Sequence, residues 1–447
     1  MQRGDDSLHT GRYLVTLKEG ADETGMKTFE SRGLRVADAR DLKNSPGFEA
    51  ASDADAVTFP EIGVALVGGR AAETSDLTVQ AEIAPDSPVE SIDPEYFMFS
   101  AGIAEEFGEE LRAELEENGS TAPRFGNDGA TVLGRLAHTM PRAAQTGRSA
   151  YLRGFIRAAE ALIQDVMVEP ESVVELEEAL ALGATWGLNV CRVPQSTRNG
   201  AGIKVAILDT GMDLGHPDFA GRPIINQSFV GQPVQDLNGH GTHCMGTACG
   251  PQSPPGTTPR YGIGYRASMY SGKVLTNAGS GTQAGVLAGI NWAIANRCQV
   301  ISMSLGAQIG VQPSYTAAGR AALNHGLLIV AAAGNAASNT GAPANSPTIM
   351  SVASLDQNLQ PSAFSNFGKV EIAAPGRDVF SSWIRPLRYR TISGTSMATP
   401  HVAGCAALWA QTSPSLRGIA LWRKLTATAR RLPFPPARVG AGLVQAP

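Results

Sequence analysis

The chain has 447 residues, of which 43% are hydrophobic and 17% are charged, with 50 glycines and 28 prolines. This composition is typical of a loop-rich globular protein of two or three domains and argues against extensive disorder or a coiled coil. No stretch reaches the roughly 18 to 20 uninterrupted apolar residues that span a bilayer, so we expect no membrane-spanning segment. The opening residues MQRGDDSLH lack an apolar core. We therefore expect either a cytoplasmic protein or a secreted one whose leader has been removed.

The net charge of -5 conceals a strong asymmetry. Residues 185–447 contain 20 Lys and Arg against 7 Asp and Glu, a balance of +13, whereas residues 1–184 contain 16 against 34, a balance of -18. Opposite fields attract, so the two parts are predicted to dock electrostatically; the alternative is two solvated surfaces without mutual contact. No run of Lys and Arg interleaves with aromatic residues, so we expect no nucleic-acid partner.

The five cysteines are an odd number without zinc-type spacing. They are expected to be small buried hydrophobic residues, with a bond between Cys244 and Cys249 as the alternative.

Residues 1–175 are predicted to form one small domain, in which strands and helices follow the ferredoxin-like α+β order. The expected elements, in chain order, are a strand at Arg12–Lys18, a helix at Thr24–Ser31, strands at Leu34–Ala39 and Ile62–Val67, a helix at Tyr151–Asp165 and an extended segment at Val168–Val174. The stretch at about 70–148 is predicted to be an acidic insertion, since Ala71 to Asp128 contains 15 acidic and two basic residues. An amphipathic helix is expected within it at Ile103–Glu117.

After residue 185, short apolar runs alternate with helical stretches and glycine-rich turns. Strands are expected at Lys204–Leu208, Ser268–Tyr270, Val300–Ser304, Leu327–Ala332 and Thr348–Ala353. Because these runs lack polar alternation, each strand should be buried on both faces, as in a parallel sheet covered by helices. Gln283–Arg297 and Pro400–Gln411 are the expected covering helices.

Polar motifs follow three of these apolar segments. Asp209 ends a buried strand, His243 closes the motif HGTH, and Ser396 stands at the start of an apolar helix. A serine hydroxyl becomes a nucleophile when a neutral imidazole removes its proton, and a carboxylate must orient that imidazole. Asn335, at the end of another buried strand, adds an amide donor for an oxyanion, with the backbone N–H of Ser396 as its partner. Each residue alone has a plain structural explanation, but together they predict acyl transfer.

Four segments resemble the subtilisin-like serine peptidases, or subtilases: Asp209–Asp213, His240–His243, Ala332–Asn335 and Gly394–Gly404. The resemblance runs from about Thr185 to Pro447 and implies a three-layer α/β domain with a mostly parallel sheet. It implies that the enzyme is a serine endopeptidase with Ser396 as nucleophile, His243 as general base, Asp209 as its orienting carboxylate and Asn335 as oxyanion donor.

The same resemblance implies that residues 1–175 are a propeptide that inhibits the catalytic domain at 185–447, with a linker and processing region at 176–184. One alternative is a latent protease with a permanent regulatory N-terminal domain. Another is a transacylase or esterase that uses the same triad, because the first half-reaction is shared.

Substrate-binding residues are also implied by the resemblance: an edge strand at Gly279, Ser280 and Gly281, pocket walls at Ser304, Leu305, Gly306, Ala332, Ala333 and Gly334, and a pocket floor at Gly341. Small walls without a carboxylate predict a protein or peptide substrate with a large apolar residue before the scissile bond. No cofactor is expected to be required. Asp218 is a candidate ligand for a structural calcium ion and is equally suited to a turn.

Overall fold

The structure, a computed structural model, describes residues 8–31, 33–41, 54–68, 71, 87–100, 183–256 and 258–447. The larger unit begins at residue 183 and contains a seven-stranded parallel sheet. Its strands are β6 (Lys204–Asp209), β7 (Ile224–Ser228), β8 (Ser268–Lys273), β10 (Val300–Met303), β12 (Leu328–Ala332), β13 (Met350–Leu355) and β14 (Ile372–Pro375). Their order across the sheet is β14-β13-β12-β10-β6-β8-β7. The five predicted strands all belong to this sheet.

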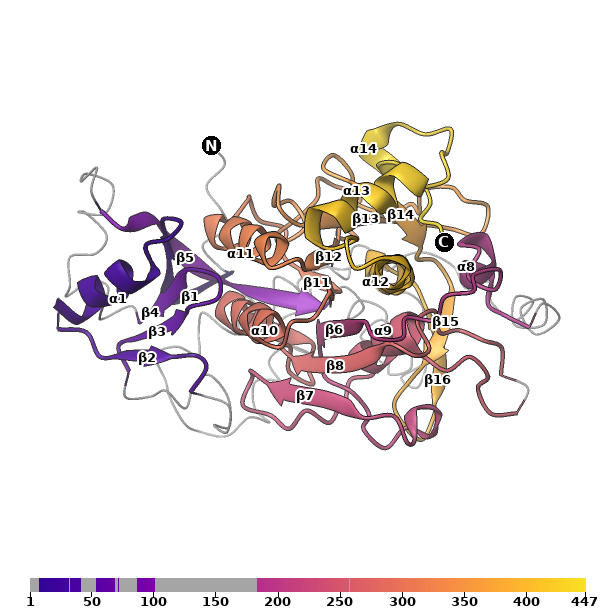
Figure 1. The fold of residues 1–447 in the computed structure, drawn as a ribbon, viewed down its shortest axis with the longest axis horizontal. Helices are drawn as coiled ribbons and strands as arrows, with labels where there is room; N and C mark the ends of the chain where they lie inside the picture. The colour runs from indigo at the N-terminus through magenta and orange to yellow at the C-terminus, as the bar shows by residue number, and fades with distance from the viewer. Residues whose placement is uncertain are drawn as a thin grey trace, which may run out of the picture.

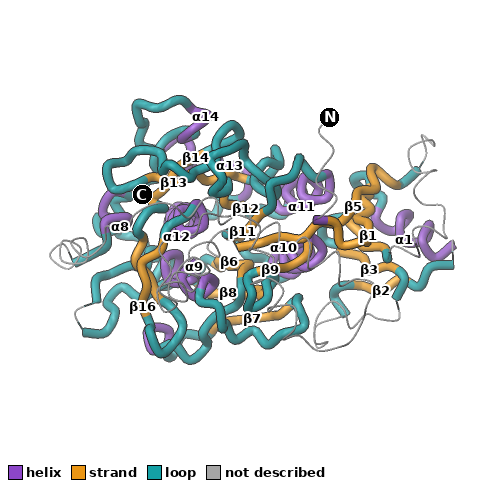
Figure 2. Tube along the Cα trace, turned by 180° about the vertical axis from the view of Figure 1, so that it is seen from behind, coloured by secondary structure: helices purple, strands orange, loops and turns teal. Residues whose placement is uncertain are grey.

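Helices cover both faces of the sheet, so the larger unit has three layers (Figures 1 and 2). One face carries α9 (His240–Cys249), α12 (Thr395–Thr412) and α13 (Gly418–Thr428), and the other carries α10 (Gln283–Ala295) and α11 (Pro313–Asn324). Side chains alternate accordingly along β6. Val205 and Ile207 share a core with α12, whereas Ala206 and Leu208 share a second core with α10. The predicted three-layer α/β fold is confirmed.

Shorter elements complete the larger unit. They are α8 (Trp186–Val190), a 3-10 turn η3 (Pro217–Phe219), β9 (Ser280–Thr282), β11 (Leu305–Gly306), the antiparallel hairpin β15 (Val379–Ser382) and β16 (Tyr389–Ile392), and α14 (Pro436–Val439). None of the described helices combines the length and apolar character that crossing a membrane requires. All five cysteines are buried and free of disulfide bonds, as predicted for small hydrophobic residues.

The N-terminal unit is a small sheet with one described helix. Its elements are β1 (His9–Leu17), α1 (Asp22–Ser31), β2 (Val36–Asp38), β3 (Ala56–Phe59), β4 (Val64–Val67) and β5 (Val89–Ser100). The strand order is β5-β1-β4-β3-β2, antiparallel except for the parallel pair β2 and β3. Ala65 and Val67 face Phe29 of α1, whereas Val64 and Leu66 face the core that contains α10 and α11.

Strand β5 corrects the predicted layout of this unit. It lies within the stretch at about 70–148 that was predicted to be an insertion, yet it pairs along β1 as part of the sheet. Its far end leaves the small sheet and pairs with both β9 and β11 of the larger unit. Figure 1 shows β5 reaching β11. The predicted elements at Ile103–Glu117, Tyr151–Asp165 and Val168–Val174 lie outside the described residues.

Candidate active site

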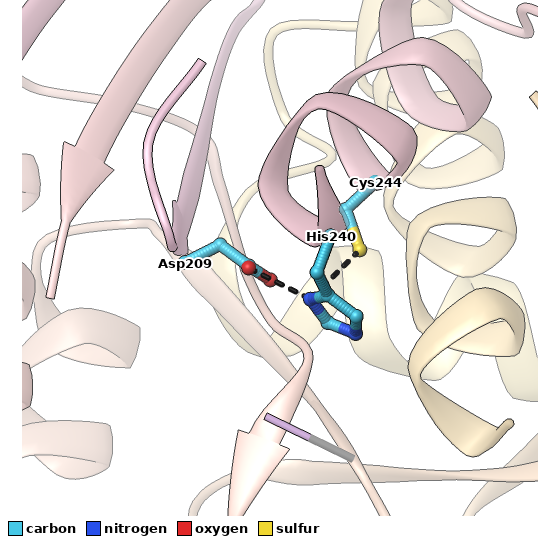
Figure 3. A group of neighbouring side chains, drawn as sticks. All are labelled: Asp209, His240 and Cys244. Carbon is cyan, nitrogen blue, oxygen red and sulfur yellow. Dashed lines mark hydrogen bonds and ion pairs between the residues drawn. The ribbon is translucent and has the colours of Figure 1, made fainter. Parts of the chain in front are cut away.

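Asp209 and His240 meet at the carboxyl end of the parallel sheet. Asp209 is the last residue of β6, and His240 is the first residue of α9. Nδ1 of His240 lies 2.7 Å from Oδ1 of Asp209, and both side chains are buried (Figure 3). Because the carboxylate accepts a hydrogen bond from Nδ1, the ring proton is held on that nitrogen and Nε2 becomes the basic atom.

His243 lies one turn further along α9 and faces another element. Its Nε2 donates to the carbonyl of Val379 at 2.9 Å, and burial lowers the pKa of His243 to about 3. Three helical residues turn a side chain by about 300° and move it about 4.5 Å along the axis, so the two rings face different neighbours. The prediction that Asp209 orients His243 is therefore wrong, and His240 takes that place.

A buried carboxylate anchors the first turn of α9. Asp236 accepts hydrogen bonds from the backbone N–H groups of Gly239 and Thr242, both at 3.0 Å. It also accepts from the hydroxyl of Thr210, the residue after Asp209, at 3.0 Å. These contacts tie the start of α9 to the end of β6 and so set the position of His240. Sequence reasoning missed Asp236, although an aspartate just before a helix is a recognisable start signal.

Lys273 adds a buried positive charge on the neighbouring strand. It ends β8, pairs with Asp209 across the sheet, and its Nζ donates to the carbonyl of Thr210. Burial lowers the pKa of Lys273 to about 8, although Asp236 and Asp209 both favour its charged form.

Ser396 lies in the first turn of α12, and the side chain of Asn335 fixes this turn through hydrogen bonds. Oδ1 of Asn335 accepts hydrogen bonds from the backbone N–H and the hydroxyl of Thr395, at 2.9 and 2.8 Å. Nδ2 of Asn335 then lies over Gly394, where an added Cβ would be 3.1 Å from it. A side-chain N–H donor is thus held beside the turn that contains Ser396, as an oxyanion site requires.

Cys244 links the histidine to the serine. Its Sγ lies 4.0 Å from Nδ1 of His240 and 3.7 Å from the carbonyl oxygen of Ser396. The hydroxyl of Ser396 donates to the carbonyl of Ser304 at 3.2 Å, and Nε2 of His240 has no hydrogen-bond partner among the described residues. A proton transfer from this serine to His240 would require the hydroxyl to rotate away from Ser304.

The charge on His240 is set by two opposing effects. Burial disfavours the protonated ring, but the adjacent Asp209 carboxylate raises the pKa of His240 well above its usual range. Asp209, His240 and Cys244 are also the group of described side chains whose metal-ligating atoms lie within 4.8 Å of one another. Zinc ligands lie about 2.0–2.3 Å from the ion. The 2.7 Å contact between Asp209 and His240 is instead a direct hydrogen bond, so this group fits proton transfer.

Asp218, the candidate calcium ligand, is held by phenol groups. The hydroxyls of Tyr261 and Tyr389 donate to its carboxylate, the latter at 2.9 Å. The residue is buried in the 3-10 turn after His216, whose Nδ1 accepts from the backbone N–H of Asp218. These donors satisfy the carboxylate without a cation. The arrangement supports a structural role that anchors the hairpin β15–β16.

The predicted edge strand at 279–281 and the predicted pocket wall at 304–306 lie on either side of β5. Gly281 of β9 pairs with Met98, and Leu305 of β11 pairs with Ser100. The backbone N–H of Ser100 also donates to the carbonyl of Gly279 at 2.9 Å. Residues 279–281 and 304–306 thus bind an extended chain by strand addition, and that chain is the protein's own N-terminal unit.

The predicted pocket walls lie together behind β11. The N–H of Gly341 donates to the carbonyl of Ala333 at 3.2 Å, and Ala307 exchanges hydrogen bonds with Ala342 at 2.9 and 3.0 Å. A Cβ on Gly341 would lie 2.4 Å from the carbonyl oxygen of Ala307, so this close approach requires glycine. Asn366, which was not predicted, supports the second wall by donating to the carbonyl of Ala333 at 3.1 Å.

Comparison with known proteins identifies the family. The model of the subtilase family matches residues 200–442. The chain belongs to the subtilase family. Thermostable alkaline protease from Halalkalibacterium halodurans is 39% identical over 277 residues, covering 60% of this chain and 74% of that protein. Thermitase from Thermoactinomyces vulgaris is 40% identical over 240 residues, covering 52% of this chain and 85% of thermitase.

A solved structure gives the same result. The crystal structure of a cold adapted subtilisin-like serine proteinase is similar at a TM-score of 0.52 and 33% identity, over 59% of this chain and 98% of that chain. The predicted family and its serine peptidase class are therefore confirmed for this subtilase. The family match begins at residue 200 and so concerns the larger unit.

Proposed function

We propose that this subtilase is a serine endopeptidase whose triad is Asp209, His240 and Ser396. The supporting observation is the buried 2.7 Å hydrogen bond between Asp209 and His240, on a helix start that contacts the turn of Ser396 through Cys244. Ser396 attacks the peptide carbonyl while Nε2 of His240 takes the hydroxyl proton and later passes it to the leaving amine. Nδ2 of Asn335 and the backbone N–H of Ser396 stabilise the oxyanion.

Substrate binding itself would prepare the nucleophile. The hydroxyl of Ser396 donates to the carbonyl of Ser304. In an antiparallel register that pairs Ser100 with Leu305, the next substrate residue lies opposite Ser304 and its N–H competes for that carbonyl. A hydroxyl displaced from Ser304 turns to Nε2 of His240, which has no hydrogen-bond partner in the described part of the chain.

The N-terminal unit is proposed to be an intramolecular inhibitor, because its strand β5 occupies the substrate edges. Specific contacts hold it there. The buried carboxylate of Glu95 accepts from the backbone N–H of Ala284, in the first turn of α10, at 3.0 Å and forms an ion pair with Arg12 at 2.6 Å. A chain held at both edges excludes other peptides from the site.

The register of β5 also suggests where the chain cuts itself. One residue beyond Ser100 would lie opposite Ser304, whose carbonyl contacts the Ser396 hydroxyl. We therefore propose cleavage of the bond after Ala101, which the register of β5 selects in this intramolecular case although alanine is small. The region 176–184, predicted from the sequence, is the competing location.

Substrate preference is proposed from the pocket walls. Apart from Leu305, residues 304–306, 332–334 and 341 are small, and none of them carries an acidic side chain. A wide apolar pocket favours large apolar side chains through burial of their surface. A peptide library should therefore be cleaved chiefly after Leu, Phe, Met or Tyr, and cleavage chiefly after Arg or Lys would refute this preference.

Mass spectrometry of the purified wild type beside Ser396→Ala tests the proposal. We expect a wild-type fragment that begins at residue 102 and an intact mutant. A fragment beginning between residues 176 and 185 would move the cleavage site but keep the nucleophile. Cleavage in both proteins would refute self-processing by Ser396. If both stay whole, a fluorophosphonate probe that labels the wild type alone would indicate a latent protease with a permanent N-terminal domain.

The transacylase or esterase alternative has its own test. An added amine competes with water for the acyl-enzyme. Hydrolysis products in excess of aminolysis products identify a peptidase, and the reverse ratio identifies a transacylase.

A further inference from the structure

Lys273, the last residue of β8, carries a buried positive charge next to the proposed triad. It is 0% exposed, and no other lysine or arginine in the described part of the chain is buried. Lysine is almost never buried completely without a charged partner, because the ammonium group loses its hydration. Here Nζ donates to two neutral oxygens, the carbonyl of Thr210 and Oδ1 of Asn277, the latter at 2.8 Å. A charge kept in such a place indicates a role beyond packing.

One contact of Lys273 fixes the backbone that follows Asp209. Thr210, whose carbonyl accepts from Nζ, comes directly after Asp209 and donates its backbone N–H to Oδ1 of that residue at 2.7 Å. Val274, the residue after Lys273, donates its N–H to the carbonyl of Asp209 at 2.9 Å. Lys273 and Asp209 also pair across the sheet. The end of β8 therefore holds the end of β6, and the carboxylate with it.

The other contact of Lys273 reaches the loop that leads to His240. Oδ1 of Asn277 accepts from Nζ of Lys273 and also from the backbone N–H of Leu237, at 3.3 Å. The carbonyl of Asn277 accepts from Nδ2 of Asn238 at 3.2 Å. Oδ1 of Asn238 in turn accepts from the backbone N–H of His240, also at 3.2 Å. An unbroken series of hydrogen bonds thus joins Lys273 to the first residue of α9.

Asn277 also belongs to the turn that precedes the substrate edge. The carbonyl of Gly279, two residues later, accepts from the backbone N–H of Ser100 of β5 at 2.9 Å. The N–H of Gly279 donates within the turn, to the carbonyl of Thr276 at 2.9 Å, which holds Gly279 in place. Nζ of Lys273 thus connects the substrate edge with the end of β6.

Negative charge near Lys273 comes from two buried carboxylates. Strands β6 and β7 and helices α9 and α10 pack against β8, and β7 and α10 contain no titratable residue. The titratable residues of β6 and α9 are Lys204 at the far end of β6, Asp209, His240, His243, Cys244 and Cys249. Burial lowers the pKa of Lys273 to about 8, although Asp236, in the loop before α9, and Asp209 favour its charged form. At neutral pH the ammonium form prevails, so one positive charge is buried beside two negative ones.

We propose that Lys273 is a positioning residue of the triad and of the substrate edge, an inference that rests on the proposed peptidase function. Its ammonium group holds Asp209 in place through Thr210 and holds the edge in place through Asn277. Its positive charge also offsets part of the negative charge that acts on His240. His240 therefore releases its proton at a lower pH than it would beside uncompensated carboxylates.

The pH dependence of kcat/KM tests the effect of the charge, in the full-chain protein once peptide-cleaving activity has appeared. A fluorophosphonate probe counts the active sites. Lys273→Met keeps the length of the side chain but removes its charge. We expect the acidic limb to move to higher pH by about 0.5 to 1 pH unit, because a nearby cation no longer opposes the imidazolium. Lys273→Arg keeps the charge and should keep the limb within about 0.2 pH unit of the wild type.

Lys204→Met is the matched control for the loss of charge. Lys204 begins β6, and its Nζ donates to the carbonyl of Asn296 at 2.9 Å. At about 3.3 Å per residue it lies about 16 Å along the strand from Asp209. The same substitution there should leave the acidic limb in place, because the Coulomb interaction with His240 falls with distance.

Two substrates test the link to the substrate edge. An extended peptide reaches residues 279–281, whereas a small acyl ester occupies only the pocket before the scissile bond. Asn277→Ala leaves the ammonium group of Lys273 in place but removes its acceptor beside the edge. It should lower kcat/KM for the extended peptide about three- to tenfold more than for the ester, which is the effect of one hydrogen bond. Its acidic limb should match that of the wild type, because the charge is retained.

A purely structural Lys273 would lower the rate without moving the limb. An unmoved limb in folded Lys273→Met, or an equal shift in Lys204→Met, therefore refutes the effect of the charge, and equal losses for both substrates in Asn277→Ala refute the link to the edge. If Lys273→Met does not fold, Lys273→Gln takes its place with the same shift expected, because glutamine is also uncharged. A wild type that neither cleaves peptides nor reacts with the fluorophosphonate at Ser396 refutes the peptidase function instead.

Discussion

His240 and His243 share a turn of α9 and are equally buried, yet their neighbours move the pKa of each ring in opposite directions. Burial disfavours protonation of both rings. At His240 the full negative charge of Asp209 outweighs burial, so the pKa rises well above the usual range. At His243 the partner is the neutral carbonyl of Val379, so burial prevails and the pKa falls to about 3. Only the first ring is suited to cycle through a protonated state during catalysis.

Replacing each histidine should separate these roles. His240→Ala should lower kcat by a factor on the order of 10⁶, the loss reported for the matching group of subtilisin, a relative of this protein. His243→Asn removes a buried hydrogen bond and should cost about 1–3 kcal/mol of unfolding free energy while the folded fraction keeps its kcat. Active-site titration and urea unfolding measure the two effects. An equal loss of kcat in folded His243→Asn would contradict the assignment.

The pH dependence of kcat/KM follows from the same contact. His240 must be neutral to accept a proton, and its pKa is raised by Asp209. Activity should therefore rise with pH through a value above about 6.5, the ordinary histidine pKa. Asp209→Asn removes the charge that favours imidazolium, so the acidic limb should move to lower pH while the rate falls by about 10⁴. A limb that moves upward in this variant would show that Asp209 does not act on His240.

At the residue scale, the sequence shows which motifs form the site, but it does not show which of two similar side chains acts in it. Asn335 and Ser396 each stand in a motif that offers one side chain of the required kind, and Asp209 differs from Asp213 in ending the predicted buried strand. The motif HGTH offers two imidazoles three residues apart, and nothing local distinguishes them. The choice depends on β6 and β15, which are distant in sequence and meet α9 through tertiary contacts.

Strands buried on both faces were the most predictable elements. Their apolar runs stop at the polar residues that begin the loops, so the expected strand beginning at Lys204 differs from β6 by one residue at its end. β5 was missed because its residues, VESIDPEYFMFS, contain a proline and three acidic side chains within an acidic stretch. It is nevertheless a strand because it pairs with β1, β9 and β11, contacts that composition does not reveal.

Glu95 should control how firmly β5 is held. Its buried carboxylate accepts from the backbone N–H of Ala284 and from Arg12, so Glu95→Gln leaves the guanidinium without its charged partner and weakens the interaction with the α10 dipole. We expect the free energy with which β5 binds the larger unit to weaken by about 1–3 kcal/mol. Peptide-cleaving activity should therefore appear earlier after refolding of the full chain.

Glu90 provides the matched control on the same strand. It is exposed, so Glu90→Gln makes an identical change of charge without removing a buried contact. The time at which activity appears should match the wild type. Equal acceleration by both variants would mean that overall charge, and not the contact of Glu95 with α10, holds the strand.

The whole molecule is joined by a shared apolar core. Leu14, Leu66 and Met98 of the N-terminal unit belong to the same cluster as residues of α10 and α11. The prediction from charge balance was electrostatic docking. Among the described residues, however, every ion pair lies within one unit or the other. A count of charges along the chain does not reveal which side chains face the contact between the units. In this protein, alternate apolar residues of β1 and β4 face it.

Salt should therefore leave the association of the two units nearly unchanged. Surface charges are screened within about 3 Å at 1 M ionic strength, whereas burial of apolar area does not weaken when salt is added. After cleavage, the N-terminal fragment should coelute with the catalytic unit on size exclusion in both 0.1 and 1 M NaCl, conditions we choose to bracket the screening length. The apparent dissociation constant should change by less than about threefold between them. Release of the fragment at high salt alone would show that the opposite charges of the two halves, and not the core around Leu66, hold the molecule together.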